Sequence, residues 1–135
     1  MKLHDEIMKI LVALNPDCPV CGHPLGGWRN ARYHHQLHNA AGNRHKFPLF
    51  IDSIHNGLPY HPHCQDNENR FFITEREAGL YEDFFQEYVN YLDGKSDENF
   101  VILKFRTLNK EYPVNMVEID FDLKRIYKIH NKIDV

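Results

Sequence analysis

Two short stretches, CPVCG at residues 18–22 and HPHC at residues 61–64, contain all three cysteines of this 135-residue chain. In each stretch two metal-binding side chains are separated by two residues, and the glycine after the first pair lets the backbone turn its amides toward sulfur. A structural zinc ion takes four such ligands in a tetrahedron. We therefore expect a Cys3His zinc site made by Cys18, Cys21, His61 and Cys64.

A zinc site with four protein ligands is closed, and so structural rather than catalytic. Residues 17–69 are rich in turn formers, and they would bury too little apolar surface to order themselves. Metal binding supplies folding free energy to such a segment. Two alternatives stay open from the sequence: His63 or His23 replaces His61 as the fourth ligand, or the three cysteines share no ion.

Helical patterns lie on both sides of this segment. Apolar residues at helical spacing predict a helix over residues 3–14, which an Asn-Pro pair ends. The sequence TERE at residues 74–77 has the form of a capping box and predicts a second helix start. Aromatic residues at three- and four-residue intervals then predict a helix of about 18 residues whose aromatic stripe belongs to the core.

The end of the chain is rich in β-branched and aromatic residues. Residues 100–105, 116–121 and 125–129 are expected to form strands of a small antiparallel sheet with one solvated face. The predicted fold class is α+β. We expect residues 1–93 to hold the N-terminal helix, the zinc-bound unit and the aromatic helix, and residues 94–135 to form a small β extension.

Charge divides the chain unevenly. Residues 18–51 contain four cations, Arg29, Arg32, Arg44 and Lys46, and no acid, whereas residues 71–135 hold nine cations against thirteen acids. The basic stretch is suited to a polyanion such as DNA. The acidic half is suited to a protein partner instead.

Composition excludes two classes of protein. With 42% hydrophobic and 26% charged residues, the chain is not disordered. No stretch reaches the roughly 18 to 20 apolar residues that a membrane span requires, and the first residues are acidic where a signal peptide would be basic and then apolar. We expect an intracellular, cytoplasmic protein without disulfides or membrane association.

Between the two metal-binding stretches the chain reads YHHQLHN at residues 33–39 and HNGLPYH at residues 55–61. Here it resembles the HNH, or ββα-metal, nuclease superfamily, and in particular small zinc-containing members encoded by bacteriophages. In that family a CxxC precedes a strand that ends in Asp-His or His-His, and a second CxxC follows a central Asn at offsets of five and eight. Asn56 precedes His61 by five residues and Cys64 by eight. The resemblance covers about residues 18–90.

The resemblance implies a role for each matching residue. His35 would be the general base that deprotonates the attacking water, and imidazole suits that role at neutral pH. His34 would ligate one Mg²⁺ or another divalent cation at the scissile phosphate. Asn56 would orient His35 through its amide. The family's remaining ligand positions fall on Gln65 and Asn69, which are weak neutral ligands. Asp66 and Glu68 lie close enough in sequence to substitute.

The function expected from this resemblance is metal-dependent hydrolysis of DNA phosphodiester bonds beside a structural zinc site. The alternative is a non-catalytic zinc-binding module that contacts DNA or a protein such as a polymerase subunit. It is favoured by the amides at residues 65 and 69 and by the acidic second half, which would repel DNA. A catalytic zinc hydrolase is disfavoured because the zinc site has no open position. The oligomeric state cannot be read from the sequence.

Overall fold

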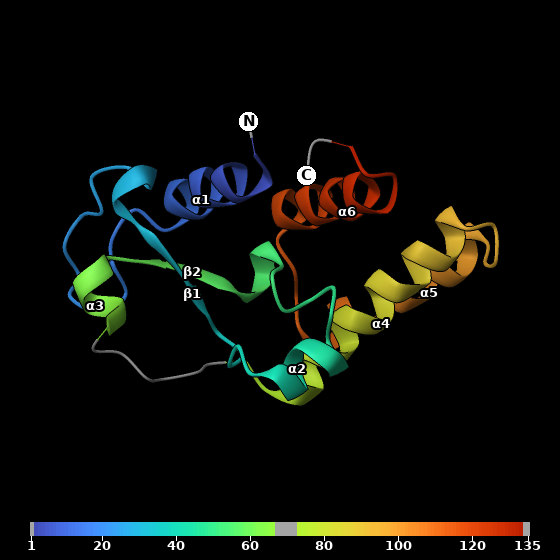
Figure 1. The fold of residues 1–135 in the computed structure, drawn as a ribbon. Coiled ribbons are helices and arrows are strands. Elements are labelled where there is room, and N and C mark those ends of the chain that lie inside the picture. Colours follow the sequence, from blue (N-terminus) through green and yellow to red (C-terminus); the bar gives the residue numbers. More distant parts are fainter. Residues whose placement is uncertain (1, 67–72, 134–135) are drawn as a thin grey trace.

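A computed structural model describes residues 2–66 and 73–133 (Figure 1). The chain forms short elements in its first half and long helices in its second. In chain order they are α1 (Leu3–Leu14), the 3₁₀ helix η1 (Trp28–Asn30), β1 (Arg32–His35), α2 (Ala41–Lys46), the 3₁₀ helix η2 (Ile54–Asn56), β2 (Gly57–Tyr60), α3 (Pro62–Asp66), α4 (Glu75–Leu92), α5 (Glu98–Glu111) and α6 (Met116–His130). In the described ranges, no helix has the length and apolar content needed to cross a bilayer.

The two strands form an antiparallel sheet that is followed at once by α3. His35 lies opposite Gly57, and Arg32 lies opposite Tyr60. Residue 57 has to be glycine because the ring of Tyr33 fills the space that a Cβ would occupy. Residues 36–56 connect the two strands in a long loop. The structure therefore has the order strand, long loop, strand and short helix.

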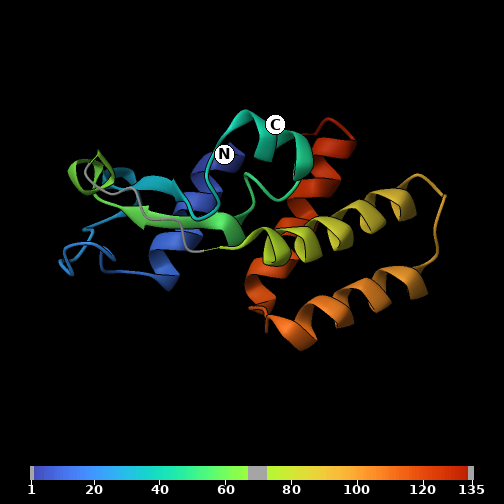
Figure 2. The same ribbon diagram turned by 90° about the horizontal axis from the view of Figure 1, so that it is seen from below.

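Two apolar clusters support this unit. In the first, α1 packs its buried face against the segment around the cysteines and the hairpin: Ile7, Met8, Leu11, Cys18, Leu25, Ala31, Ile54, Tyr60 and Cys64. In the second, the aromatic face of α4 packs against the loop, α5 and α6: Leu37, Phe47, Phe50, Ile51, Ala78, Tyr81, Phe84, Phe85, Leu108, Ile119 and Ile126. Figure 2 shows α4 and α5 as an antiparallel pair that extends away from the hairpin.

The helices predicted over residues 3–14 and from residue 75 onward are confirmed. Thr74 caps α4 by accepting a hydrogen bond of 3.2 Å from the N–H of Glu77, as the capping-box pattern indicated. The α4 stripe, which includes Tyr81, Phe84 and Phe85, is buried in the core. The predicted α+β class also holds, although the protein is mostly helical and its sheet has two strands.

The small C-terminal sheet predicted from residues 100–105, 116–121 and 125–129 is wrong, because these residues lie in α5 and α6. Both helices have strong N-caps. Asp97 accepts hydrogen bonds from the N–H groups of Asn99 and Phe100, and Asn115 caps α6 in the same way. The sheet of the protein lies in its N-terminal half.

The strand prediction failed because a six-residue window that is dense in apolar residues fits both the two-residue repeat of a strand and the 3.6-residue repeat of a helix. In α5 the residues that face α4 are Val101, Phe105 and Leu108, at intervals of four and three. In α6 the buried apolar residues Ile119 and Ile126 are two helical turns apart. The alternation of apolar and acidic residues at positions 116–121 therefore belongs to a helix, and only Ile119 of these apolar residues is buried.

A buried polar network joins α6 to the end of the long loop. Asp122, which is fully buried, accepts hydrogen bonds from Ser53 Oγ at 2.5 Å, His55 Nδ1 at 2.6 Å and Arg125 Nε at 2.9 Å. Arg125 also donates to the carbonyl oxygen of Leu49 at 2.7 Å. Burial raises the pKa of Asp122, but the hydrogen bond from His55 and the charge of Arg125 outweigh it and lower the pKa below its ordinary value.

A second helix holds the same loop. Glu82 of α4 accepts hydrogen bonds from the N–H groups of Leu49 and Phe50 at 3.0 and 2.9 Å. Helices α4 and α6 therefore fix residues 49–55 with buried charged side chains, in addition to apolar packing.

We predict that Asp122→Asn lowers the free energy of unfolding by about 3 kcal/mol, because it leaves the buried Arg125 without its counter-charge. Urea denaturation at pH 7 measures this. The exposed Asp120, on the same helix, is the matched control, and Asp120→Asn should change stability by less than about 0.5 kcal/mol. Because the folded pKa of Asp122 is lowered, its contribution is complete above the unfolded pKa of about 3.9 and is lost as the pH falls further. The difference in free energy of unfolding between wild type and Asp122→Asn should therefore become smaller below about pH 4.

Candidate functional site

The structure brings together the four residues predicted to bind zinc. The ligand atoms of Cys18, Cys21, His61 and Cys64 all lie within 4.8 Å of one another, and Cys21 Sγ is 3.3 Å from His61 Nδ1. Zinc–ligand bonds of about 2.0 to 2.3 Å in a tetrahedron place ligand atoms about 3.5 to 3.8 Å apart. The cluster therefore has the ligand set and approximately the spacing of a Cys3His zinc site.

Local backbone hydrogen bonds shape each half of this cluster. The N–H of Gly22 donates to the carbonyl of Cys18 at 2.8 Å, and Gly22 has a φ of 76°, a left-handed conformation that favours glycine. On the other half, the N–H of Cys64 donates to the carbonyl of His61 at 3.1 Å where α3 begins. In each half, the two potential ligands are thus carried by one tight turn of the backbone, which places both side chains toward the cluster.

The electrostatics of the cluster fit a cation. Burial raises the pKa of Cys18, but the backbone N–H groups of Cys21, His61 and Val20 outweigh it and lower the pKa to about 6. Burial, followed by the neighbouring Cys18 and Cys21, raises the pKa of Cys64 to about 12. Three sulfurs this close cannot all carry negative charge without a compensating positive ion, which is the charge that zinc supplies.

The ring of His61 is oriented as in many metal sites, with one nitrogen facing the other ligands and the other nitrogen hydrogen-bonded to the backbone. Its Nε2 lies 3.2 Å from the carbonyl oxygen of Pro24, which can only accept, so this nitrogen carries the proton. Nδ1, which faces Cys21, then has the free lone pair. Of the other fourth ligands considered, His63 stacks on His61 with ring centroids 5.4 Å apart and His23 is exposed, and neither belongs to the cluster.

The two histidines at the end of β1 lie on opposite faces of the hairpin, as neighbours on a strand do. His34 is buried, and its ring stacks on Tyr60 with centroids 4.3 Å apart. His35 is partly exposed and packs edge-on against Tyr33. His34, a predicted ligand of the catalytic cation, therefore faces away from His35, and the other predicted ligand, Asn69, and the possible substitute Glu68 lie outside the described residues. Within those residues, the cysteine–His61 cluster is the only group of three or more potential ligands.

Asn56 is fully buried at the end of the long loop. Its Oδ1 accepts a hydrogen bond of 2.7 Å from the N–H of Leu37, and its Nδ2 donates to the carbonyl of Ile51 at 2.9 Å. Its side-chain bonds thus go to the loop backbone, rather than to His35 as the resemblance implied. Asn56 ties the start of the loop to its end.

A carboxylate that sequence reasoning missed contacts His35. Nε2 of His35 lies 3.1 Å from Oδ1 of Asp52, and Arg44 binds both oxygens of Asp52 at 2.9 and 3.0 Å. The hydrogen bond from His35 and the charge of Arg44 hold the pKa of Asp52 well below its usual range despite burial. An ionised carboxylate only accepts hydrogen bonds, so Nε2 of His35 carries a proton. The only sequence signal was an acid placed directly after an acid-free basic stretch.

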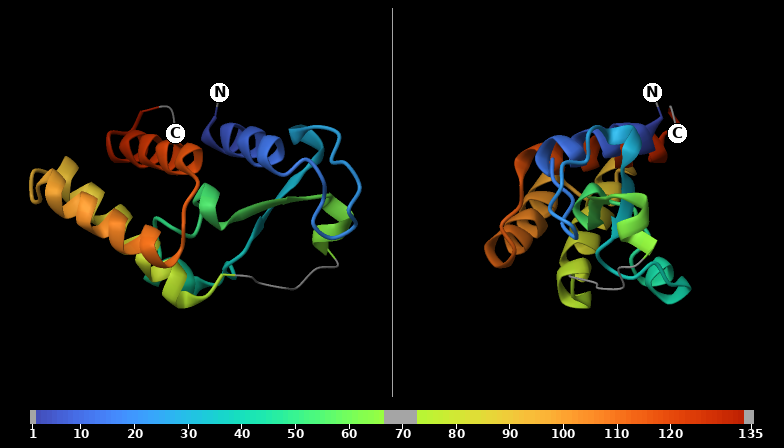
Figure 3. Two further views of the ribbon diagram at one scale, coloured as in Figure 1. Left: turned by 180° about the vertical axis from the view of Figure 1, so that it is seen from behind. Right: turned by 90° about the vertical axis from the view of Figure 1, so that its left-hand side faces the viewer.

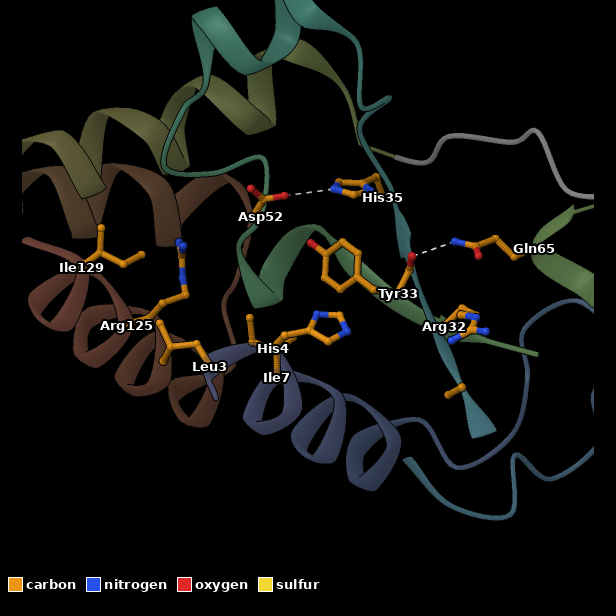
Figure 4. A pocket seen from close by; sticks show the side chains of 11 residues that line it. Leu3, His4, Ile7, Arg32, Tyr33, His35, Asp52, Gln65, Arg125 and Ile129 are labelled. Atoms are coloured by element: carbon orange, nitrogen blue, oxygen red, sulfur yellow. Dashed lines mark hydrogen bonds and ion pairs between the residues drawn. The ribbon is translucent and has the colours of Figure 1, made fainter. Parts of the chain in front are cut away.

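His35 and Asp52 open into a cleft of about 530 Å³ between the hairpin and helices α1 and α6 (Figure 4). Figure 3 shows these two helices on the same side of the hairpin. Arg32, Tyr33 and Gln65 line the cleft on the hairpin side. The amide of Gln65, at a ligand offset of the family, donates to the carbonyl of Tyr33 at 2.7 Å.

No protein family, curated protein or solved structure that was compared with this chain matches it. What the molecule establishes is thus a cluster with the composition of a zinc site and, at the other end of the paired strands, a histidine that contacts a carboxylate at the wall of a cleft.

We predict that the purified protein binds one zinc ion per chain and that His61→Ala loses it. Metal content measured after dialysis against EDTA should fall for His61→Ala, because one of four ligands is gone. His23→Ala and His63→Ala are the matched controls and should keep zinc. If His63→Ala loses zinc while His61→Ala keeps it, the fourth ligand is misassigned.

Asn56→Ala should lower the free energy of unfolding by about 3 kcal/mol, because it leaves the N–H of Leu37 and the carbonyl of Ile51 buried without partners. Asn43→Ala is the control within the same loop, since its amide bonds the carbonyl of His38 at an exposed position. Its cost should stay below about 1 kcal/mol. Equal losses in denaturant titrations of the two variants would show that Asn56 does not tie the loop.

Proposed function

We propose that this protein is a DNA endonuclease of the HNH type in which His35 is the general base. The observation that carries the proposal is the His35–Asp52 contact of 3.1 Å at the wall of an open cleft. The surrounding architecture also supports it: an antiparallel hairpin with a long loop tied by Asn56, followed by a short helix and joined to an earlier turn by the cysteine–His61 cluster.

The contacts of His35 define its proton transfer. With Nε2 protonated toward Asp52, Nδ1 has the lone pair and takes a proton from water. The resulting hydroxide attacks phosphorus, the bond from phosphorus to the leaving sugar oxygen breaks, and that oxygen takes a proton from solvent. Asp52 stabilises the imidazolium that forms, and Arg44 holds Asp52 in place.

Arg32 is an exposed cation among the residues that line the cleft, and we assign it to a substrate phosphate. A divalent cation would neutralise charge on the phosphate and the leaving oxygen. Because the described residues include no ligand set for it, we assign no step to that ion.

The second candidate is a non-catalytic module that binds DNA through its basic stretch or a protein through its acidic half. It is favoured by Gln65, because an amide at a ligand position of the family is a weak neutral ligand. In this alternative, His35 and Asp52 form an ordinary surface pair, and the zinc cluster has only a structural role.

Cleavage of supercoiled plasmid tests the proposal. With Mg²⁺, Mn²⁺ or Ni²⁺, zinc-loaded wild type should nick or linearise the plasmid, and His35→Ala should be at least about 100-fold slower because it lacks the base. His45→Ala removes an exposed histidine from the same loop and should keep full activity. Asp52→Asn should slow cleavage about 10-fold or more, because it removes the charge that stabilises the imidazolium.

DNA binding without cleavage under any of the three ions would overturn the nuclease and support the binding module. Cleavage that persists in His35→Ala would show that His35 is not the base.

A further inference from the structure

The cleft beside His35 has two chemically different sides (Figure 4). Its hairpin side carries His35, Asp52 and Arg32, which suit a phosphate and the reacting water. Its opposite side comes from α1 and α6, which contribute three apolar residues, Leu3, Ile7 and Ile129, together with His4 and Arg125. A volume of about 530 Å³ is within the range of pockets that bind small organic ligands.

The apolar residues on this side are held in place, and one of them is exposed. Ile129 is 41% exposed, although it faces a cleft between ordered elements. Helix α6 is anchored by Arg125, which bonds the carbonyl of Leu49, and α1 by the burial of Ile7 and Leu11. The polar side is equally fixed, since the hydroxyl of Tyr33 donates to the carbonyl of Ser53 at 2.7 Å.

Continuous duplex DNA would leave this apolar surface unused. In a duplex each base is stacked and paired, so phosphates and sugars could reach the cleft but the face of a base could not. An unpaired base has two such faces, and proteins bind single strands by placing bases on apolar or aromatic side chains beside a cationic track. The cationic side of the cleft fits the phosphate of that same nucleotide.

We propose that this cleft holds one unpaired DNA nucleotide, with its base against Leu3 and Ile129 and its phosphate beside Arg32 and His35. The substrate is then DNA with an unpaired position, such as a bulge, a gap or a single strand, rather than continuous duplex. This inference rests on the proposed function, because it assigns the scissile phosphate to His35.

The test compares three DNAs of one sequence with the zinc-loaded full chain at fixed salt: a continuous duplex, the duplex with one bulged 2-aminopurine, and the single strand containing 2-aminopurine. Fluorescence anisotropy in EDTA-free buffer with Ca²⁺ measures affinity, and 2-aminopurine emission reports the environment of the base. We expect the bulged and single-stranded DNAs to bind about 10-fold more tightly than the duplex, which corresponds to a difference in binding free energy of about 1.4 kcal/mol.

The double variant Leu3→Ser/Ile129→Ser should weaken binding of the bulged DNA about 5-fold or more and abolish the emission change. The matched control is Leu14→Ser/Ile102→Ser, which alters the other end of α1 and a residue of α5 that is 37% exposed. It should leave both signals unchanged. Circular dichroism checks that both variants are folded, and the comparison of DNAs in the wild type does not depend on either variant.

Equal affinity for the duplex and the bulged DNA would overturn the inference, and so would an emission change that survives in Leu3→Ser/Ile129→Ser. Duplex cleavage that requires His35, without preference for the bulge, would leave the proposed function intact and overturn only the inference. A preference for unpaired DNA without cleavage would overturn the nuclease and leave the binding assignment supported.

Discussion

The cluster of Cys18, Cys21, His61 and Cys64 is the constraint on which the N-terminal half depends. Its ligand atoms, which come from the turn after α1 and from the start of α3, all lie within 4.8 Å of one another, and β1 and β2 lie between these two segments in the chain. A segment this rich in turns has few other means of fixing both ends of a hairpin. The apolar cluster around Leu11 and Tyr60 adds packing on one side, and Cys18 and Cys64 belong to that cluster as well as to the metal ligands.

The long loop between the strands is held by a different kind of interaction. Asn56 closes the loop on itself, whereas Glu82 and Asp122 bind its backbone and side chains from two separate helices. Buried carboxylates are costly unless every oxygen is paired, and both are bonded here to donors from the loop. This arrangement positions Asp52, and through it His35, on a rigid support.

The sequence predicted those parts of the molecule that depend on local pattern. The x₂ spacings of the cysteines and His61, the capping box at Thr74 and the stripe on α4 each leave a signal within a few residues. The apolar runs at residues 100–105, 116–121 and 125–129 do not by themselves distinguish a strand from a helix, whereas the caps Asp97 and Asn115 that begin α5 and α6 do. The His35–Asp52 contact and the Asp122 network could not be predicted, because their partners are 17 and up to 69 residues apart and no periodicity links them.

The hydrogen bond between Ser53 and Asp122 also bears on the order in which parts of the structure form during synthesis. Residues 49–55 are completed well before α6 leaves the ribosome, and their buried partners Asp122 and Arg125 are then still to come. The emerging chain can form its hairpin and bring the cysteine–His61 cluster together, but the segment that holds Asp52 stays unanchored until α6 has emerged. The His35–Asp52 contact is therefore fixed in place later than the hairpin itself, and a chain that stops before α6 would form the cysteine–His61 cluster without the helix that anchors residues 49–55.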